Sequence, residues 1–176
     1  IVNLKNYTSK VLIDYDTKSR YRFGDITFSQ SSIKRSLLER YLIFNAMDYY
    51  NSYLLEESRK NLANNGYFSQ VTITPELDNT DNDITPINIS LLPQNQVTYA
   101  FGLGYGTDTG IRGMATSNIR WINSSGHSIQ LQARGSQNND QLSANYRIPG
   151  TIPSISSYSI GAGAMNIEQV TGNAKN

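Results

Sequence analysis

The feature that most constrains this chain is a strict period-two alternation that begins at Val97. As far as Gly106, odd-numbered positions are apolar and mostly aromatic, whereas even-numbered positions carry threonine, alanine or glycine. Successive side chains of a strand point to opposite faces of its sheet. The segment is therefore predicted to be a strand with one apolar face and one nearly bare face.

The same alternation recurs in four later segments. They are residues 112–121, 128–134, 142–148 and 157–164, separated by the turn-like stretches Thr107–Gly110, Asn123–Gly126, Gly135–Asp140 and Pro149–Pro153. Strands of roughly 8–11 residues joined by short turns predict an antiparallel meander. Residues 97–176 carry only 5 Lys+Arg and 3 Asp+Glu, against 10 and 11 in residues 1–96, so uncharged polar residues dominate their polar face.

Two different folds share this alternation. A soluble sheet, such as a lipocalin-like sheet around an apolar ligand, keeps its apolar face inside. A transmembrane β-barrel turns its apolar face to lipid and its polar face to the interior. The barrel is favoured by the arginines at 112, 120, 134 and 147, which share the polar phase, and by aromatic residues near strand ends, where an interfacial girdle is expected: Tyr105, Trp121, Tyr146 and Tyr158.

The first half of the chain predicts a small α+β module. Its strand signals lie near Tyr21–Phe28, at Phe68–Pro75 and at Ile84–Leu92, and the acidic segment Glu76–Asp83 is the expected turn between the last two. Two helical segments lie between the first and second strands. The expected order is therefore strand, helix, helix, strand, strand.

Capping residues and apolar spacing locate the two helices. Ser31 or Ser32 can cap the first helix, and Asn51 or Ser52 can cap the second. Gly66 is expected to end the second helix, because glycine adopts a positive φ without a Cβ clash. The apolar positions of both helices and of the strands predict the core, namely Ile33, Leu37, Tyr41, Leu55, Leu62, Val71 and Ile89.

Composition excludes several classes of function. The absence of cysteine excludes a disulfide scaffold, a cysteine zinc site and a cysteine nucleophile. The single histidine, His127, has no nucleophile motif around it, and Asp78, Asp81 and Asp83 lack the pattern of a calcium loop. A net charge of +1 gives no indication of a nucleic-acid partner. We expect no catalytic residue, no cofactor and no metal.

Neither a transmembrane helix nor a signal peptide is visible in the sequence. The chain begins and ends within a pattern, so we expect it to be a piece of a longer protein.

Several short motifs, taken in order, resemble a known family. The segment Gly66–Val71, followed by an acidic turn and Pro86–Pro93, resembles the end of a POTRA module. The segment Gly102–Gly110 resembles the first barrel strand and loop of the BamA/TamA superfamily of outer-membrane assembly factors, and Arg120–Asn123 continues the resemblance. The motifs Arg20–Gly24, Gly126-His127 and Tyr146–Pro149 are most similar to the TamA branch. Where the family usually has a glycine before Asp48, this chain has Met47.

The resemblance implies an α+β POTRA module followed by antiparallel strands of a transmembrane β-barrel, about five of the larger number that a whole barrel needs. Residues 1–19 would end a preceding POTRA module. Residues 20–93 would be a POTRA module in the periplasm. Residues 97–176 would be the N-terminal strands of the barrel in the outer membrane.

The resemblance also implies a non-enzymatic function in the assembly or translocation of outer-membrane proteins. The expected partners are unfolded outer-membrane protein or autotransporter clients, a TamB-like periplasm-spanning protein and membrane lipid. A client could add to an exposed sheet edge of the module through main-chain hydrogen bonds, and the first barrel strand could exchange partners along a lateral seam.

Three sets of residues follow from this interpretation. The client edge is Phe68, Gln70, Thr72 and Thr74. The lateral-seam strand is Val97, Tyr99, Phe101, Gly102, Leu103, Gly104 and Tyr105, in which glycine raises the conformational freedom of the strand. The lumen wall is Arg112, Arg120, Arg134 and Arg147.

Overall fold

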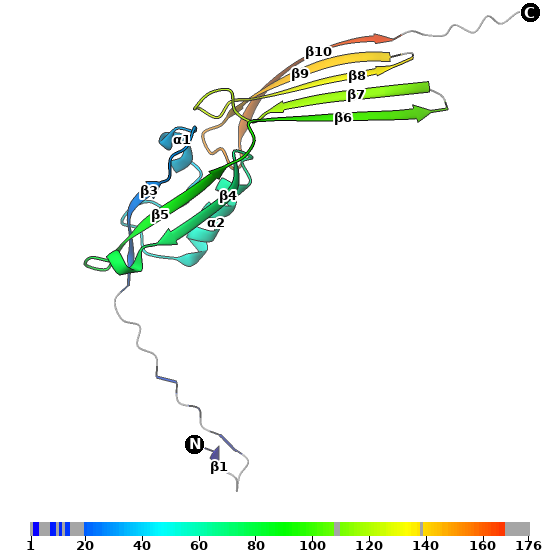
Figure 1. Ribbon diagram of the computed structural model, residues 1–176. Coiled ribbons are helices and arrows are strands. Elements are labelled where there is room, and N and C mark those ends of the chain that lie inside the picture. Colours follow the sequence, from blue (N-terminus) through cyan, green and yellow to red (C-terminus); the bar gives the residue numbers. More distant parts are fainter. Residues whose placement is uncertain are drawn as a thin grey trace, which may run out of the picture.

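The computed structural model describes residues 2–3, 8–9, 11, 13–14, 20–107, 110–137 and 139–167. Two parts follow one another along the chain, an α+β module and a long five-stranded sheet (Figure 1). Near the N-terminus, β1 (Val2–Asn3) pairs with β2 (Thr8–Ser9). Most of residues 1–19, expected to end a preceding module, lie outside the described residues, so that assignment stays a prediction.

The module has a three-stranded mixed sheet with two helices. Its elements are β3 (Arg22–Phe28), α1 (Arg35–Glu39), α2 (Ser52–Ala63), β4 (Phe68–Pro75), the 3-10 helix η1 (Leu77–Asn79) and β5 (Ile84–Pro93). β5 is the central strand, parallel to β3 and antiparallel to β4. The predicted order of strand, helix, helix, strand, strand is confirmed.

A single hydrophobic core fills the module. Every residue predicted for this core from the apolar spacing is buried, and Leu62 and Ile89 are fully buried. Phe23 packs at 4.3 Å between ring centroids against Phe44, so the first strand is fixed to the segment that follows α1. Burial of these side chains is the main stabilising contribution to the module.

The second helix begins and ends where the sequence predicts. The Asn51 side chain accepts a hydrogen bond of 2.9 Å from the Tyr53 N–H, which satisfies one free donor of the first turn. Gly66 has a φ of +81° shortly after the helix ends at Ala63. Within the described residues, no helix has the length and apolar character needed to cross a membrane.

The first helix is shorter than the predicted span from its serine cap to Tyr41, and the predicted serine cap is wrong. α1 begins after Lys34, and the Ser31 hydroxyl instead accepts from the Ile33 N–H at 3.1 Å, within the turn before the helix. Beyond Glu39 the chain continues in turns in which Tyr41 N–H donates to the Leu38 carbonyl at 3.0 Å. One helical turn flanked by tight turns therefore holds Ile33, Leu37 and Tyr41 on one buried face.

Met47 occupies the family's glycine position and keeps the backbone conformation that glycine would adopt. Its φ is +72°, a region that is unfavourable for a residue with a Cβ. Its N–H donates to the Phe23 carbonyl at 2.7 Å, and its own carbonyl accepts from Arg22 Nη1 at 2.7 Å. These contacts to β3 hold the turn in spite of the side chain.

The second part is an antiparallel meander of β6 (Val97–Gly106), β7 (Gly110–Ile119), β8 (Ser128–Ser136), β9 (Asn139–Pro149) and β10 (Ser157–Ile167). The strand order is β10-β9-β8-β7-β6, so each strand pairs with its neighbours in sequence. Among the described residues β6 and β10 do not pair with each other, and the sheet is open.

The strand register carries the predicted alternation across the whole sheet. One transverse row consists of Phe101, Ala115, Ala133, Leu142 and Ala164. The adjacent row consists of Gly102, Met114, Arg134, Gln141 and Met165. Because neighbouring rows point to opposite faces, the sheet has one apolar face and one polar face.

Candidate functional site

β4, which carries the predicted client edge, is an outer strand of the module's sheet. It pairs with β5 on one side, and the described part of the chain places no strand on its other side. The side chains of Gln70, Thr72 and Thr74 are exposed, whereas Phe68 is buried in the core. Phe68 can therefore offer an added strand only its backbone.

The opposite edge of the same sheet, β3, is covered by its own chain. Phe23 N–H donates to the Asp48 carbonyl at 2.9 Å, and Arg35 Nη2 donates to the Ile26 carbonyl at 3.0 Å. These contacts occupy backbone groups that an added strand would need. β4 is consequently the more accessible edge.

β6, which carries the predicted lateral seam, is an outer strand of the large sheet. Its apolar side chains are strongly exposed, from 69% for Tyr99 to 92% for Leu103. It pairs with β7 alone among the described residues, so the backbone groups along its other edge are open to a further strand.

The two seam glycines differ in what surrounds them. A Cβ on Gly104 would lie 3.1 Å from Arg112 Nε, so this glycine makes room for an arginine on the neighbouring strand. A Cβ on Gly102 would meet only the Met114 side chain, with Cε at 3.7 Å and Cβ at 4.0 Å, both ordinary contacts. The lack of space for a side chain therefore explains glycine at position 104 but does not explain glycine at position 102.

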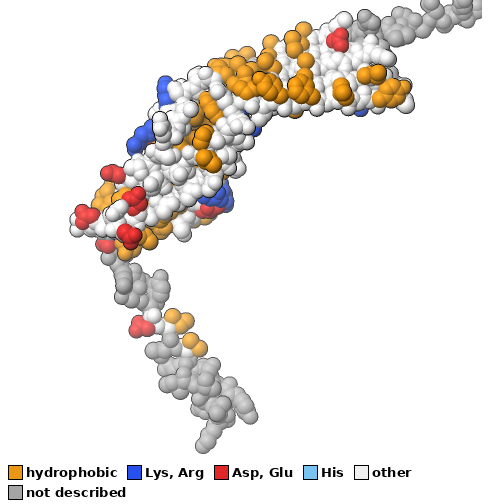
Figure 2. Space-filling model, in the orientation of Figure 1, with side chains coloured by type: hydrophobic (Ala, Val, Ile, Leu, Met, Phe, Trp, Pro, Cys, Tyr) orange, Lys and Arg blue, Asp and Glu red, His pale blue; other side chains and the backbone are white. Residues whose placement is uncertain are grey.

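The apolar face of the sheet carries many exposed hydrophobic side chains, which form an apolar band. Figure 2 shows hydrophobic side chains gathered over the sheet, whereas most visible charged side chains lie on the module. The band includes Phe101, Leu103, Ile111, Leu142, Tyr158 and Ile160, all more than half exposed. An apolar band of this kind requires an apolar environment, as the lipid-facing side of a barrel has.

The four arginines predicted to form one wall lie at two separate places on the polar face. Arg112 and Arg134 line a hollow of about 510 Å³ together with Gly104 and Gln141. Arg120 follows the end of β7, where its Nε donates to the Asn95 carbonyl at 3.1 Å. With Arg147 it lines a different cavity beside the module. Whether the polar face is the lumen side stays a prediction.

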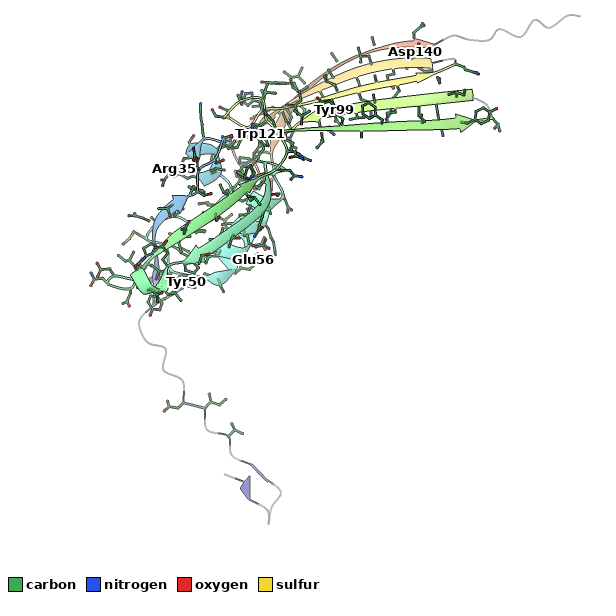
Figure 3. The ribbon with its side chains drawn as sticks, in the orientation of Figure 1. Arg35, Tyr50, Glu56, Tyr99, Trp121 and Asp140 are labelled. Atoms are coloured by element: carbon green, nitrogen blue, oxygen red, sulfur yellow. The ribbon has the colours of Figure 1, made fainter. Side chains whose placement is uncertain are left out.

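Trp121 does not belong to an interfacial girdle, and that expectation is corrected. Its ring lies edge-on to Tyr67 with centroids 6.4 Å apart, and it packs against the module's core (Figure 3). Tyr146 is also engaged, because its hydroxyl lies 2.6 Å from His127 Nδ1. Tyr105 and Tyr158 are exposed on the apolar face near opposite ends of the sheet.

Hydrogen bonds between distant residues fasten the module to the turns of the sheet. Lys34 N–H donates to the Ser124 carbonyl at 2.8 Å, and Tyr67 Oη donates to the Gly126 carbonyl at 2.7 Å. The guanidinium of Arg40 donates to the carbonyls of Gly150 and Thr151, in the turn between β9 and β10. The module thus contacts two turns on the same end of the sheet.

Sequence reasoning missed this junction. The one signal in the sequence was the glycine at position 126. The structure requires glycine there, since its φ is +73° and a Cβ would lie 2.5 Å from Tyr67 Oη and 2.6 Å from Leu37 Cδ2. Nothing local marks Arg40 or Tyr67 as junction residues. Burial raises the pKa of Tyr41 and of Tyr67 beside this junction, so both hydroxyls stay protonated at neutral pH.

Comparison with known proteins agrees with this architecture. Residues 21–92 match the family described as "POTRA: Surface antigen variable number repeat". The outer membrane protein assembly factor BamA of Buchnera aphidicola subsp. Acyrthosiphon pisum (strain APS) is 31% identical over 110 residues. The match covers 62% of this chain and 18% of that protein, so the chain spans less than a fifth of its length.

Two solved structures share the fold. The crystal structure of BamA from Haemophilus ducreyi lacking POTRA domains 1–3 has a TM-score of 0.79 and 18% identity, covering 95% of this chain and 32% of that chain. CdiB from Acinetobacter baumannii has a TM-score of 0.60 and 18% identity, covering 83% of this chain and 28% of that chain.

The predicted fold class is confirmed: the chain has a POTRA module followed by an antiparallel sheet of five strands, open rather than closed, that matches part of the BamA structure. The matches support the predicted resemblance of this chain to the BamA superfamily. The predicted localisation, with the sheet in the outer membrane and the POTRA module in the periplasm, agrees with the similarity to BamA, an outer-membrane protein.

Proposed function

We propose that this chain is part of a factor that assembles or secretes other outer-membrane proteins. The observation that carries the proposal is β6, an outer strand with an open edge and an apolar face that is 69–92% exposed from Tyr99 to Tyr105. Such a strand can pair with a client strand while its apolar side chains face lipid. The similarity to BamA and CdiB supports the same function.

The POTRA module would receive the client before it reaches the sheet. An extended client segment adds to β4 through main-chain hydrogen bonds, which need no particular client sequence. Exposed Gln70, Thr72 and Thr74 would contact its side chains. The junction bonds to the two turns would then hold the module close to the sheet while the client passes to it.

β6 would form one side of a lateral seam in the whole barrel, closed by weak pairing with the last strand. Gly102 supports this role, because its small size is not explained by any close neighbour and glycine leaves the strand less firmly fixed. A client strand would displace the last strand along β6, backbone group by backbone group.

A cross-link across the seam tests this function. In the full-length parent, one cysteine replaces Thr98 on β6 and another replaces the facing residue of the last barrel strand. We expect the disulfide to stop client assembly and a reductant to restore it. The matched control joins Ala100 to Thr116, which are partners on β6 and β7, and leaves the seam free. Assembly at the normal rate with the seam locked would exclude the mechanism.

A TamA-like role is the finer form of the proposal. The motifs Arg20–Gly24, Gly126-His127 and Tyr146–Pro149 support it. Its partners would be autotransporter clients, membrane lipid and a TamB-like periplasm-spanning protein. Co-purification of such a protein with the parent, and its loss when residues 20–93 are deleted, would distinguish this role from a general assembly role.

One observation favours a second function, the binding of an apolar ligand by a soluble sheet. The apolar face has a hollow of about 860 Å³ lined by Phe101, Leu103, Ala115, Ala133 and Leu142, among others. In a barrel this hollow faces lipid acyl chains. Partition of the full-length parent with the outer membrane, and its need for detergent on extraction, would decide for the barrel.

A further inference from the structure

A polar cavity of about 150 Å³ lies where the POTRA module meets the sheet. Tyr41 and Asn65 line it from the module, and Arg120, Ser128 and Arg147 line it from the sheet. None of the described residues that line it is acidic. The cavity is large for a single water molecule, whose share of liquid volume is about 30 Å³.

Asn65, in the wall of this cavity, has a side-chain hydrogen-bond donor without a partner. Its Oδ1 accepts from the Tyr67 N–H at 2.7 Å, which fixes the orientation of the amide. Its Nδ2 is then buried and, among the described residues, has no hydrogen-bond partner. Buried donors without an acceptor are rare in folded proteins, and this one lies behind the cavity wall with almost no accessible surface of its own.

Positive charge surrounds the same donor. The guanidinium of Arg120 comes within 3.6 Å of the Cβ position that a side chain at Gly66 would have, next to Asn65. The charge of Arg147 acts on both Tyr41 and Tyr67 and opposes the rise that burial gives to their pKa values. Tyr41 remains protonated at neutral pH, and its hydroxyl interacts with that of Tyr67.

We propose that this cavity binds a phosphate group. Polar side chains line it from the module and from two strands of the sheet, and a tetrahedral oxyanion has oxygens directed to several sides at once. A carboxylate has only two oxygens, in one plane. Arginine forks suit phosphate in geometry and charge. The site is distinct from the two strand edges, and its failure would leave the proposed assembly function untouched.

The ligand would enter from the polar face of the sheet. A second hollow of about 270 Å³ shares Asn65, Arg120, Ser128 and Arg147 with the cavity and extends to Gln130 and Asn145. The phosphate therefore belongs either to free inorganic phosphate on that side or to a lipid headgroup at the periplasmic end of the sheet. Both sources offer the same chemistry to the same donors.

Titration of the full-length parent with inorganic phosphate tests the proposal. The protein is held in phosphate-free detergent, and binding is followed by calorimetry. We expect Arg147→Gln to weaken binding about tenfold or more, because a charged hydrogen bond to phosphate is lost. Asn65→Asp should weaken it similarly, since the carboxylate keeps an oxygen for the Tyr67 N–H but replaces the Nδ2 donor with negative charge.

The matched control is Arg134→Gln, an arginine of the same face that does not line this cavity. It should leave phosphate binding unchanged. If inorganic phosphate does not bind, the same variants are compared in nanodiscs of phosphatidylcholine with and without phosphatidic acid, whose headgroup is a phosphate monoester. Thermal stabilisation of the wild type by phosphatidic acid, lost in Arg147→Gln and Asn65→Asp, supports the lipid source.

Three results would overturn the proposal. The first is the absence of a response to both free phosphate and phosphatidic acid. The second is an equal loss in Arg134→Gln, which would indicate unspecific attraction to positive charge. The third is equal affinity for acetate and for phosphate, which would exclude a site shaped for four oxygens.

Discussion

The module and the sheet of this chain are stabilised in different ways. Among the described residues, all buried hydrophobic side chains except Pro153 lie between Phe23 and Leu91, within the module. In the five strands of the sheet only Thr116 is buried, so far as their residues are described. The module therefore has its own core, whereas the sheet has hydrogen-bonded strands and no second layer.

The difference shows what the alternating pattern can and cannot specify. In the module, each apolar stripe meets another stripe of the same chain, as Leu62 and Ile89 do in the core. In the sheet, the pattern sorts side chains to two faces, but the apolar face meets only what surrounds the molecule. In the proposed barrel, the stability of the sheet would depend on lipid and on further strands.

The largest expected effect comes from the module's core. Leu62→Ala removes a fully buried side chain, and we expect it to lower the free energy of unfolding by roughly 2–5 kcal/mol. Urea unfolding of residues 20–93 alone measures it, because a module with its own core should fold without the sheet. Leu77→Ala, at a position 65% exposed, is the control and should change little. Failure of residues 20–93 to fold would contradict the conclusion that the module is stabilised by its own core.

A charge on the sheet tests its dependence on lipid. Leu131→Arg places an arginine in the middle of β8 on the apolar face, and we expect it to destabilise the full-length parent in bilayers by about 2–4 kcal/mol. Gln130→Arg, one residue away on the polar face, should cost little. The measurement is the folded fraction in lipid vesicles against denaturant. A larger effect of Gln130→Arg would mean that the face of Gln130, and not the face of Leu131, contacts lipid.

The local sequence pattern was sufficient to predict those elements whose pairing and capping groups lie within the module. The bounds of β4, Phe68–Pro75, and the cap at Asn51 were predictable from alternation and capping chemistry. The first helix was overestimated for a physical reason. Spacing of four between Ile33, Leu37 and Tyr41 requires that these residues share a face, but tight turns on either side of one helical turn achieve this as well as a long helix.

The junction could not be predicted, because its contacts join residues far apart in the sequence. Tyr67 and Gly126 are 59 residues apart, and Arg40 and Gly150 are 110 apart. The position of Trp121 near a strand end predicted an interfacial role, whereas the ring packs against Tyr67. The cavity with Asn65 exists only once both parts are assembled, so no sequence motif marked it.

The smallest expected effect concerns the contact that couples the two regions. Tyr67→Phe removes the hydroxyl that donates to the Gly126 carbonyl, and we expect the free energy of unfolding of the full-length parent to fall by about 0.5–1.5 kcal/mol. Tyr53→Phe, at an exposed position of α2, is the matched control and should have no effect. In isolated residues 20–93 the Gly126 partner is missing, so Tyr67→Phe should cost less there. An equal cost in both proteins would mean that the hydroxyl serves the module alone.

The same variant has a pH signature. Burial raises the pKa of Tyr67 in the folded protein above its ordinary value of 10.0, so the folded state holds its proton more tightly than the unfolded state. The wild type should then lose stability as the pH rises beyond about 10, whereas at lower pH this contribution is fully present. Tyr67→Phe should lose less over the same interval, and part of the remaining loss should come from Tyr41, whose pKa burial also raises. Denaturant unfolding of the full-length parent between pH 8 and about 11.5 measures the difference between the two slopes, and identical slopes would exclude Tyr67 as a group whose protonation stabilises the junction.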